Sequence, residues 1–210
     1  MAVSKEDVLR WLAALEQVFA ENRQRLTDLD LAIGDADHGT NMNRGFTAVQ
    51  AELEAHLPAD LACVFQSVAA VLIRNVGGAA GPLYGTFFLR AGGACSEKTE
   101  LEAADVVALF AAGIEGVQQR GKAAPGDKTM IDALLPALDS MRRALEGGSD
   151  VAGILDQGAA AAEAGMLATI PMQARKGRAS YLGVRSIGHQ DPGATSSYLL
   201  LKAAAETWRA

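Results

Sequence analysis

Apolar residues recur at helical spacing along most of the chain. The first such stripe consists of Val8, Trp11, Leu12, Leu15, Val18 and Phe19. Ser4, with Asp7 three residues later, resembles a capping box and predicts where this first helix begins. Similar patterns predict further helices over residues 41–56, 60–75, 82–92, 101–119, 128–146, 150–168 and 194–209. The period-two alternation of half-buried strands is not sustained anywhere, so the pattern predicts an all-α protein of eight helices.

Length and composition indicate one globular unit. The chain has 210 residues, half of them hydrophobic, and we expect a single domain over residues 1–210. Its net charge of -6 disfavours non-specific binding to nucleic acid or to an anionic membrane surface. No uncharged stretch approaches the roughly 18 residues of a membrane span. Cys63 and Cys95 follow no metal-binding spacing and are expected to be core thiols, so we predict a soluble, cytoplasmic protein.

The most informative segment is the run DLAIGDADHGTN at residues 30–41. Asp35 and Asp37 would diverge by about 200° on an α-helix, so only a folded-back loop would let both converge with Asp30. Gly34 and Gly39 permit such a loop. Three carboxylates packed together repel one another, whereas a divalent cation that prefers oxygen ligands, such as Mg²⁺ or Ca²⁺, removes that cost. Mg²⁺ is favoured if a phosphate completes its coordination, and the alternative is a solvated acidic turn that caps a helix.

Two further segments are rich in small residues. The first, GGAAGPLYGT at residues 77–86, either lets backbone N–H groups approach an anion at a helix N-terminus or packs two helices closely. Near the second, around Gly121, two sequences come close to a P-loop but lack its spacing, and a helix rather than a strand precedes them. Asp127, Lys128 and Thr129 then either line a site or form a turn and a helix cap.

A basic segment follows in this acidic chain. Residues 164–190 contain no Asp or Glu, while Arg175, Lys176, Arg178 and Arg185 give them a local charge of +4. This asymmetry indicates either an anionic partner or a mobile solvated loop. Small neighbours would let Arg178 bind a phosphate through two parallel hydrogen bonds. Asp191 and Pro192 either complete the same site or simply begin the last helix.

Together these segments resemble the nucleotide-binding L subunits of bacterial dihydroxyacetone kinases. The resemblance rests on IGDADHGTNMNRGF at 33–46, VGGAAGPLYGTFF at 76–88, RGKAAPGDKTM at 120–130 and MQARKGRASYLGVRSIGHQDPGATS at 172–196, and it covers essentially the full chain. It implies a barrel of eight antiparallel helices, with the nucleotide site in loops at one end.

The resemblance also implies roles for individual residues. In this family three aspartates bind Mg²⁺ that bridges nucleotide phosphates, which implies that role for Asp30, Asp35 and Asp37. The implied nucleotide contacts are His38, Gly39, Thr40, Asn41, Ala79, Ala80, Gly121, Met130, Arg178, Asp191, Pro192 and Gly193. Ala80 stands where the family often has a hydroxyl side chain, so a backbone N–H would contact phosphate there. Arg178 is the expected catalytic residue, because phosphoryl transfer depends on positioning and charge neutralisation.

The function implied by the resemblance is a phosphoryl relay. The chain would carry ADP or ATP with Mg²⁺ and pass a phosphoryl group to dihydroxyacetone, which a separate K subunit holds. The length of the chain accommodates only the L part, which resembles the phosphotransferase-system type, in which a phosphohistidine protein rephosphorylates the bound ADP. Those two proteins are the expected partners, and a homodimer is also considered. The alternatives are an L-type subunit of an ATP-dependent three- or four-carbon ketose kinase and a non-catalytic nucleotide-binding regulator.

Overall fold

The computed structural model describes residues 2–209, which contain helices and no β-sheet. The helices are α1 (Lys5–Glu21), α2 (Arg23–Ile33), α3 (His38–Ala55), α4 (Leu61–Asn75), α5 (Ala80–Ala94), α6 (Ala103–Gly121), α7 (Ile131–Glu146), α8 (Val151–Ala168), the 3-10 helix η1 (Arg178–Ser186) and α9 (Pro192–Thr207). One isolated antiparallel bridge joins Val3 to Leu101. The prediction of an all-α fold is confirmed. Within the described part of the chain, no helix has the length and apolar character needed to cross a bilayer.

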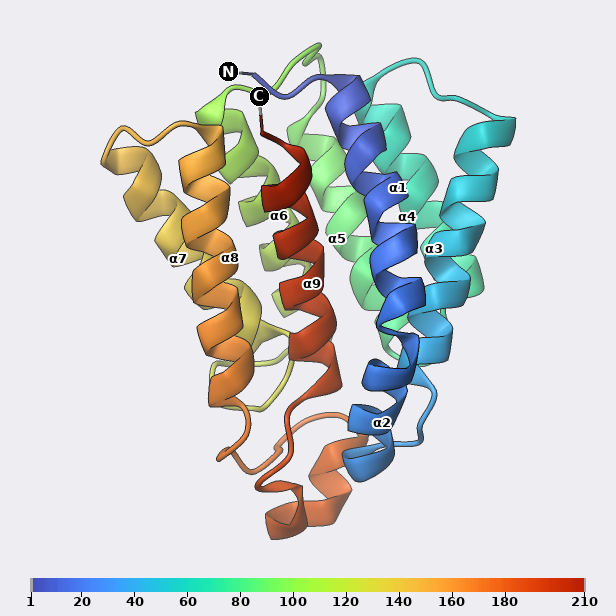
Figure 1. Ribbon diagram of the computed structural model, residues 1–210, viewed down its shortest axis with the longest axis vertical. Coiled ribbons are helices and arrows are strands. Elements are labelled where there is room, and N and C mark those ends of the chain that lie inside the picture. The colour runs from blue at the N-terminus through green and yellow to red at the C-terminus, as the bar shows by residue number, and fades with distance from the viewer. Residues whose placement is uncertain (1, 210) are drawn as a thin grey trace.

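The long helices pack side by side around a common core (Figure 1). From α3 to α9, each of these helices contacts the next one along the chain, and α9 returns to contact α1, which also contacts α3. α2 and η1 contact each other and lie at one end of the molecule, opposite the two chain ends (Figure 1). The circuit of helices therefore separates an end that holds the chain termini from an end that holds α2 and η1.

An aromatic cluster occupies the core where the first and last helices meet. The ring of Trp11 on α1 lies 5.7 Å from that of Phe88, 6.1 Å from Phe110 and 5.1 Å from Trp208, measured between centroids. These four side chains are fully or almost fully buried and come from α1, α5, α6 and the residue after α9. Large aromatic surfaces contribute strongly to core stability. This cluster therefore stabilises the packing of helices that are far apart in the sequence.

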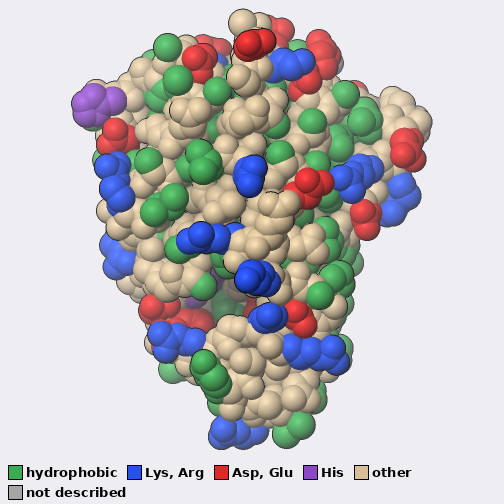
Figure 2. Space-filling view, turned by 180° about the vertical axis from the view of Figure 1, so that it is seen from behind, with side chains coloured by type: hydrophobic (Ala, Val, Ile, Leu, Met, Phe, Trp, Pro, Cys, Tyr) green, Lys and Arg blue, Asp and Glu red, His purple; other side chains and the backbone are tan. Residues whose placement is uncertain are grey.

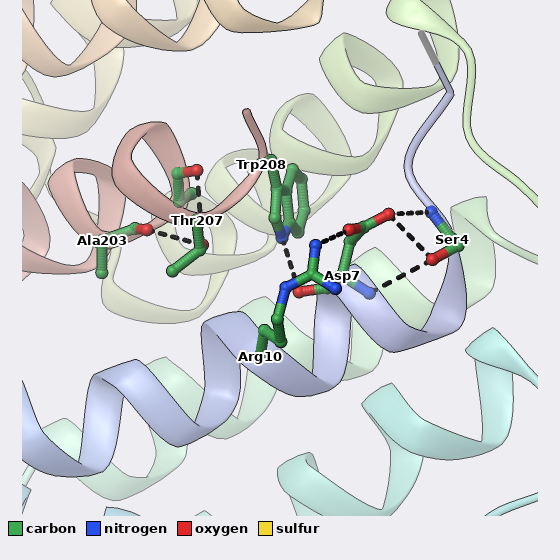
Figure 3. Close-up of polar contacts among 7 residues, drawn as sticks. Ser4, Asp7, Arg10, Ala203, Thr207 and Trp208 are labelled. Carbon is green, nitrogen blue, oxygen red and sulfur yellow. Dashed lines mark hydrogen bonds and ion pairs between the residues drawn. The ribbon is translucent and has the colours of Figure 1, made fainter. Parts of the chain in front are cut away.

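The start of α1 is capped and tied to the end of α9 (Figure 3). Ser4 and Asp7 form the predicted capping box: the Asp7 N–H donates to Ser4 Oγ at 3.2 Å, and the Ser4 N–H donates to Asp7 Oδ2 at 2.7 Å. Arg10 forms an ion pair with the same carboxylate. The indole N–H of Trp208 donates to the carbonyl oxygen of Asp7 at 3.1 Å. These bonds connect the first and last helices at the end of the molecule away from α2.

Two helical segments differ from the expectation based on apolar spacing. α2 is not predicted, because its 11 residues are mostly polar and bury only Leu26, Asp30 and Ile33. η1 is not predicted either, because it is a 3-10 helix interrupted at Gly183, where φ is 56°. Cys63 is exposed, so its prediction as a core thiol is wrong, whereas Cys95 is buried.

Candidate functional site

Three carboxylates converge at the end of the molecule that holds α2 and η1. Asp30 lies in the last turn of α2, Asp35 in the loop that follows, and Asp37 is the N-cap of α3. One oxygen from each carboxylate lies within 4.8 Å of the other two. Carboxylate oxygens at this spacing can share a divalent cation of the hard, oxygen-preferring type.

The backbone between the aspartates is shaped to bring them together. Asp30 Oδ2 accepts hydrogen bonds from the backbone N–H groups of Asp37, at 2.9 Å, and His38, at 3.1 Å, so this buried side chain caps α3. Ala36 has a φ of 62°, a left-handed conformation that costs about 1–2 kcal/mol in a non-glycine residue. At Gly34 a Cβ atom would lie 2.0 Å from Asp30 Oδ1, so only glycine leaves that carboxylate in place.

His38 joins a buried hydrogen-bond chain behind the carboxylates. Its Nε2 lies 2.9 Å from Ser196 Oγ, which also accepts a bond from the Tyr84 hydroxyl at 2.7 Å. Burial lowers the pKa of His38, although Asp30 and Asp37 act in the opposite direction. Burial raises the pKa of Tyr84 to about 12. Both side chains are therefore uncharged at neutral pH, and the chain of bonds connects α3, α5 and α9 beneath the site.

A cavity of about 530 Å³ lies over the carboxylates. Figure 2 shows a hollow in the lower part of the molecule, with acidic and basic side chains around it. The volume is typical of small-molecule sites. The residues predicted from the sequence that line the cavity are Asp30, Asp35, Asp37, His38, Asn41, Ala79, Ala80, Met130, Arg178, Asp191, Pro192 and Gly193. The structure thus brings together four loops that are far apart in the sequence.

Three predicted contacts do not line this cavity: Gly39, Thr40 and Gly121. Gly39 packs against α2, where a Cβ atom would lie 2.0 Å from the carbonyl oxygen of Arg23. Thr40 is exposed. Gly121 is exposed and lies next to Leu83, since a Cβ atom there would be 3.3 Å from Leu83 Cδ2, and of these two residues only Leu83 lines the cavity. These three residues therefore belong to the sequence motifs but not to the cavity wall.

Four helices begin at the cavity wall. Their N-cap residues are Asp37 for α3, Ala79 for α5, Met130 for α7 and Asp191 for α9. The N-cap of α5 is an alanine and offers no side-chain acceptor to the first N–H groups of that helix. Free N–H groups and the positive end of a helix dipole attract anions. The small-residue segment also packs closely, since a Cβ atom at Gly81 would lie 2.2 Å from the carbonyl oxygen of Val76.

The basic segment forms one wall of the cavity. We call residues Met172–Ile187 the basic strap. Its residues from Arg175 to Tyr181 line the cavity, whereas Arg185 does not. The Arg178 guanidinium lies 3.1 Å from Asp35 Oδ2, and both side chains are partly exposed. An ion pair that is open to water contributes little stability, so a bound anion can compete for the guanidinium.

A buried polar layer below the cavity is not evident from the sequence. The sequence is compatible with Lys128 either in a site or in a turn. In the structure Lys128 lines the cavity, yet it is only 1% exposed. Asp191 accepts a hydrogen bond from the Ala194 N–H at 2.7 Å. Burial, with the nearby carboxylate of Asp132, raises the pKa of Asp191 to about 7, although Lys128 and that hydrogen bond act in the opposite direction. No spacing rule predicts this layer, because its members come from separate loops.

Comparison with known proteins identifies the family. Residues 32–206 match the DAK2 domain model. The chain is 45% identical over 202 residues to the ADP-binding subunit of the PEP-dependent dihydroxyacetone kinase of Escherichia coli K12, covering 96% of both chains. It is 40% identical to the ADP-binding subunit of the PTS-dependent dihydroxyacetone kinase of Lactococcus lactis, covering 94% of both. The human triokinase/FMN cyclase is 37% identical, but the match covers only 34% of that longer protein.

Solved structures agree with this relationship. The dihydroxyacetone kinase of C. freundii in complex with AMP-PNP and Mg²⁺ matches 98% of this chain with a TM-score of 0.77 and 26% sequence identity. The chain spans about a third of the length of that kinase, since the match covers 34% of it. The resemblance that the loop motifs indicated is confirmed. The chain belongs to the DAK2 domain family, which includes the ADP-binding subunits of bacterial dihydroxyacetone kinases.

Proposed function

We propose that this chain is the ADP-binding subunit of a phosphotransferase-system dihydroxyacetone kinase and acts as a single domain over residues 1–210. The observation that carries the proposal is the convergence of Asp30, Asp35 and Asp37 beside a cavity lined by helix N-termini and Arg178. Relatives that align with nearly the whole chain are ADP-binding subunits of such kinases. We also propose that the protein is cytoplasmic.

The three aspartates would hold Mg²⁺. The convergence of three carboxylate oxygens within 4.8 Å fits a divalent cation. When bound, the cation neutralises charge on the nucleotide phosphates. Asp30 is buried and fixed by two backbone N–H donors, so it would give the ion site a rigid side.

The nucleotide would lie along the helix N-termini. The first N–H groups of α5, near Ala79 and Ala80, would donate to phosphate, because no side chain occupies them as a cap. His38 and Asn41 on α3, Met130 before α7, and Asp191 with the N-terminus of α9 complete the proposed wall. Gly39, Thr40 and Gly121 stay predicted contacts on the motifs alone, since they do not line the cavity.

Arg178 is proposed as the catalytic residue. Its guanidinium lies next to Asp35, so it stands beside the proposed cation site rather than at a distance from it. Phosphoryl transfer develops charge on the transferred group, and a guanidinium can stabilise that charge through paired hydrogen bonds. The chain needs no nucleophile of its own for this chemistry, because positioning and electrostatic stabilisation suffice.

The overall architecture is proposed to be the eight-helix antiparallel barrel of the family. The closed circuit of α1 and α3 to α9 supports this reading. α2 and η1 then lie at the open end of the barrel, next to the loops that form the site.

The partners are proposed to dock around the cavity mouth. Leu31 on α2 and Tyr181, Val184 and Ile187 on the basic strap are large apolar residues with exposed fractions of 68%, 88%, 69% and 45%. Exposed apolar surface near a functional site is typical of an interaction surface. We infer that the K-type subunit, which holds the sugar, covers this apolar rim and that the phosphohistidine protein approaches the same cavity. A homodimer is not required by this arrangement.

A reconstitution assay tests the function. The purified chain alone is expected to transfer no phosphoryl group from ATP to dihydroxyacetone. Addition of a K-type subunit, a phosphohistidine protein and the phosphoenolpyruvate system should produce the sugar phosphate. Turnover by the chain alone at an ordinary enzymatic rate would contradict the subunit proposal. Complex formation without product would favour a nucleotide-binding regulator, and a preference for four-carbon ketoses would favour the alternative kinase.

The phosphoryl donor is tested by nucleotide exchange. The site is enclosed by several loops, which would have to move together for nucleotide to leave. ADP that co-purifies with the chain and exchanges over minutes would support its use as a bound cofactor. Exchange faster than the turnover of about 1–100 s⁻¹ typical of kinases, from a nucleotide-free preparation, would favour soluble ATP as the donor.

A further inference from the structure

We propose that Lys128 is a positioning residue that clamps the basic strap, and with it Arg178, over the site. The ammonium group of Lys128 donates to the carbonyl oxygen of Met172 at 3.0 Å and to that of Ser186 at 2.5 Å. Met172 is the first residue of the strap and Ser186 the last but one. A single buried side chain therefore joins the two ends of the segment that carries Arg178.

A backbone hydrogen bond next to Lys128 also attaches the strap to this loop. The carbonyl oxygen of Asp127 accepts a hydrogen bond from the Arg175 N–H at 3.0 Å. Lys128 itself has a φ of 62°, in the left-handed region that glycine adopts most easily. A lysine in this conformation persists only where its surroundings favour it strongly. The two bonds of its ammonium group supply that preference.

Apolar contacts hold the strap only weakly. Ala174, Ala179 and Leu182 pack with Ile33 in a small cluster that is separate from the main core. Three larger apolar residues of the strap, Tyr181, Val184 and Ile187, are exposed instead. Because hydrophobic stabilisation grows with the apolar area that is buried, this cluster contributes little. The main attachment of the strap to the loop before α7 therefore consists of hydrogen bonds: the one that the Asp127 carbonyl accepts from Arg175 and the two that Lys128 donates.

Hydrogen bonds within the strap link the segment that Lys128 attaches to the helix that carries Arg178. Ser186 Oγ accepts a hydrogen bond from the Ala174 N–H at 2.9 Å and donates to the carbonyl oxygen of Gly183 at 2.6 Å. These bonds hold the start of the strap against the end of η1, and Arg178 is the first residue of η1. Loss of the Lys128 ammonium would leave the carbonyl groups of Met172 and Ser186, the second of which is buried, without this donor and free both ends of the strap.

Lys128→Met tests the proposal, with Lys122→Met as the matched control. Lys122 lies in the same connection between α6 and α7 and also has a left-handed φ, of 50°, but its side chain is exposed. Trypsin cleavage after Arg175, Lys176, Arg178 or Arg185, followed by mass spectrometry without nucleotide, reports on opening of the strap. We expect about tenfold faster cleavage there in Lys128→Met, as for the loss of buried charged donors, with wild-type rates in Lys122→Met.

Nucleotide release gives a second readout, which rests on the proposed function. ADP with Mg²⁺ should dissociate about tenfold faster from Lys128→Met, while Lys128→Arg, which keeps charged donors, should recover part of the wild-type rate. Wild-type protein that binds no ADP would refute the proposed function, whereas the cleavage experiment would still decide the role of Lys128. Wild-type cleavage and release in a folded Lys128→Met variant would overturn the proposal. If that variant does not fold, Lys128→Gln carries the same test.

Discussion

At the scale of single residues, the three aspartates differ in what else they hold. Asp30 is buried and accepts two backbone N–H groups, Asp35 is paired with Arg178, and Asp37 is exposed at the start of α3. Their shared feature is one proposed cation. On this proposal the three aspartates act as one unit even though their surroundings are unlike.

Replacing any one of these aspartates with asparagine should weaken nucleotide binding. Loss of a charge that organises the cation and its phosphates is expected to cost more than about 2 kcal/mol of ADP affinity at saturating Mg²⁺. Isothermal titration calorimetry measures the affinity directly. Asp28→Asn on the exposed side of α2, where Asp28 bonds only Gln24 among the described residues, is the control and should leave the affinity unchanged. Wild-type affinity in all three variants would reduce the segment to an acidic turn.

Asp191 should make stability depend on pH. Burial raises its pKa from 3.8 to about 7, so between these values the folded protein keeps a proton that the unfolded chain releases. The free energy of unfolding should therefore fall as the pH rises from 4 to 7, by up to about 4 kcal/mol, because one pKa unit corresponds to about 1.4 kcal/mol. Asp191→Asn keeps a side-chain oxygen that can cap α9, but the amide does not ionise. The free energy of unfolding of this variant should therefore not show this decline.

Urea denaturation at a series of pH values measures that difference. Asp150→Asn is the matched control, because Asp150 is the N-cap of α8 and accepts from the Gly153 N–H at an exposed position. It should keep the wild-type dependence on pH. Parallel curves for wild type and Asp191→Asn between pH 4 and 7 would show that the burial of Asp191 has no such effect.

Much of the site follows from residue types and order, and the remainder depends on three-dimensional packing. Asp30, Asp35 and Asp37 are separated by too few residues to be independent, and glycines mark the turn that joins them. Lys128 lies in a sequence that also fits an ordinary turn, and its function depends on carbonyl groups more than forty residues away. Gly121 shows the reverse case, since its motif resembles that of the family, but its neighbour Leu83 lines the cavity and Gly121 does not.

At the scale of helices, apolar spacing predicts long amphipathic segments and misses short polar ones. α2 is a helix because tertiary contacts with α3 and η1 support it, and its own apolar residues are too few to form a stripe. η1 is interrupted at Gly183 and buries only Ala179 and Ser186, so it shows no apolar stripe either. Both missed elements lie beside the cavity, where the sequence serves the geometry of the site rather than burial.

Glycines on helix surfaces provide an opposed pair of predictions. At Gly165 of α8, a Cβ atom would lie 2.2 Å from the carbonyl oxygen of Asp132 on α7, so Gly165→Ala should destabilise the fold by about 1–3 kcal/mol. At Gly93 of α5, nothing lies within 4 Å of such an atom, so Gly93→Ala should stabilise the fold by up to about 1 kcal/mol. Chemical denaturation measures both. Equal effects of the two substitutions would mean that α7 and α8 can separate without cost.

At the scale of the whole molecule, the apolar rim and the site lie at the same end. The double variant Leu31→Ser, Val184→Ser should therefore weaken binding of the K-type subunit by at least about tenfold, as expected for the loss of apolar anchors at an interface. Neither residue lines the cavity, so ADP affinity should not change. Surface plasmon resonance with the immobilised partner gives the first quantity and calorimetry the second.

Leu57→Ser is the control for this experiment. Leu57 is 62% exposed, much like Leu31, but it lies in the connection between α3 and α4, at the end away from the site. Its replacement should leave partner binding at the wild-type level. If both variants bind the partner as the wild type does, the rim has another role.

The aromatic cluster around Trp11 belongs to the main core, whereas the basic strap packs in a separate small cluster, so we expect the two parts to open independently. Amide hydrogens of the helices that meet there are expected to exchange with solvent only when the whole bundle unfolds, because the rings of Trp11, Phe88 and Phe110 that join these helices are fully buried. Amides of the basic strap lie outside that cluster and are protected by a few hydrogen bonds. Their exchange should therefore report an opening of the strap alone, which costs less free energy than unfolding of the bundle. Nucleotide could then enter and leave many times within the lifetime of one folded bundle.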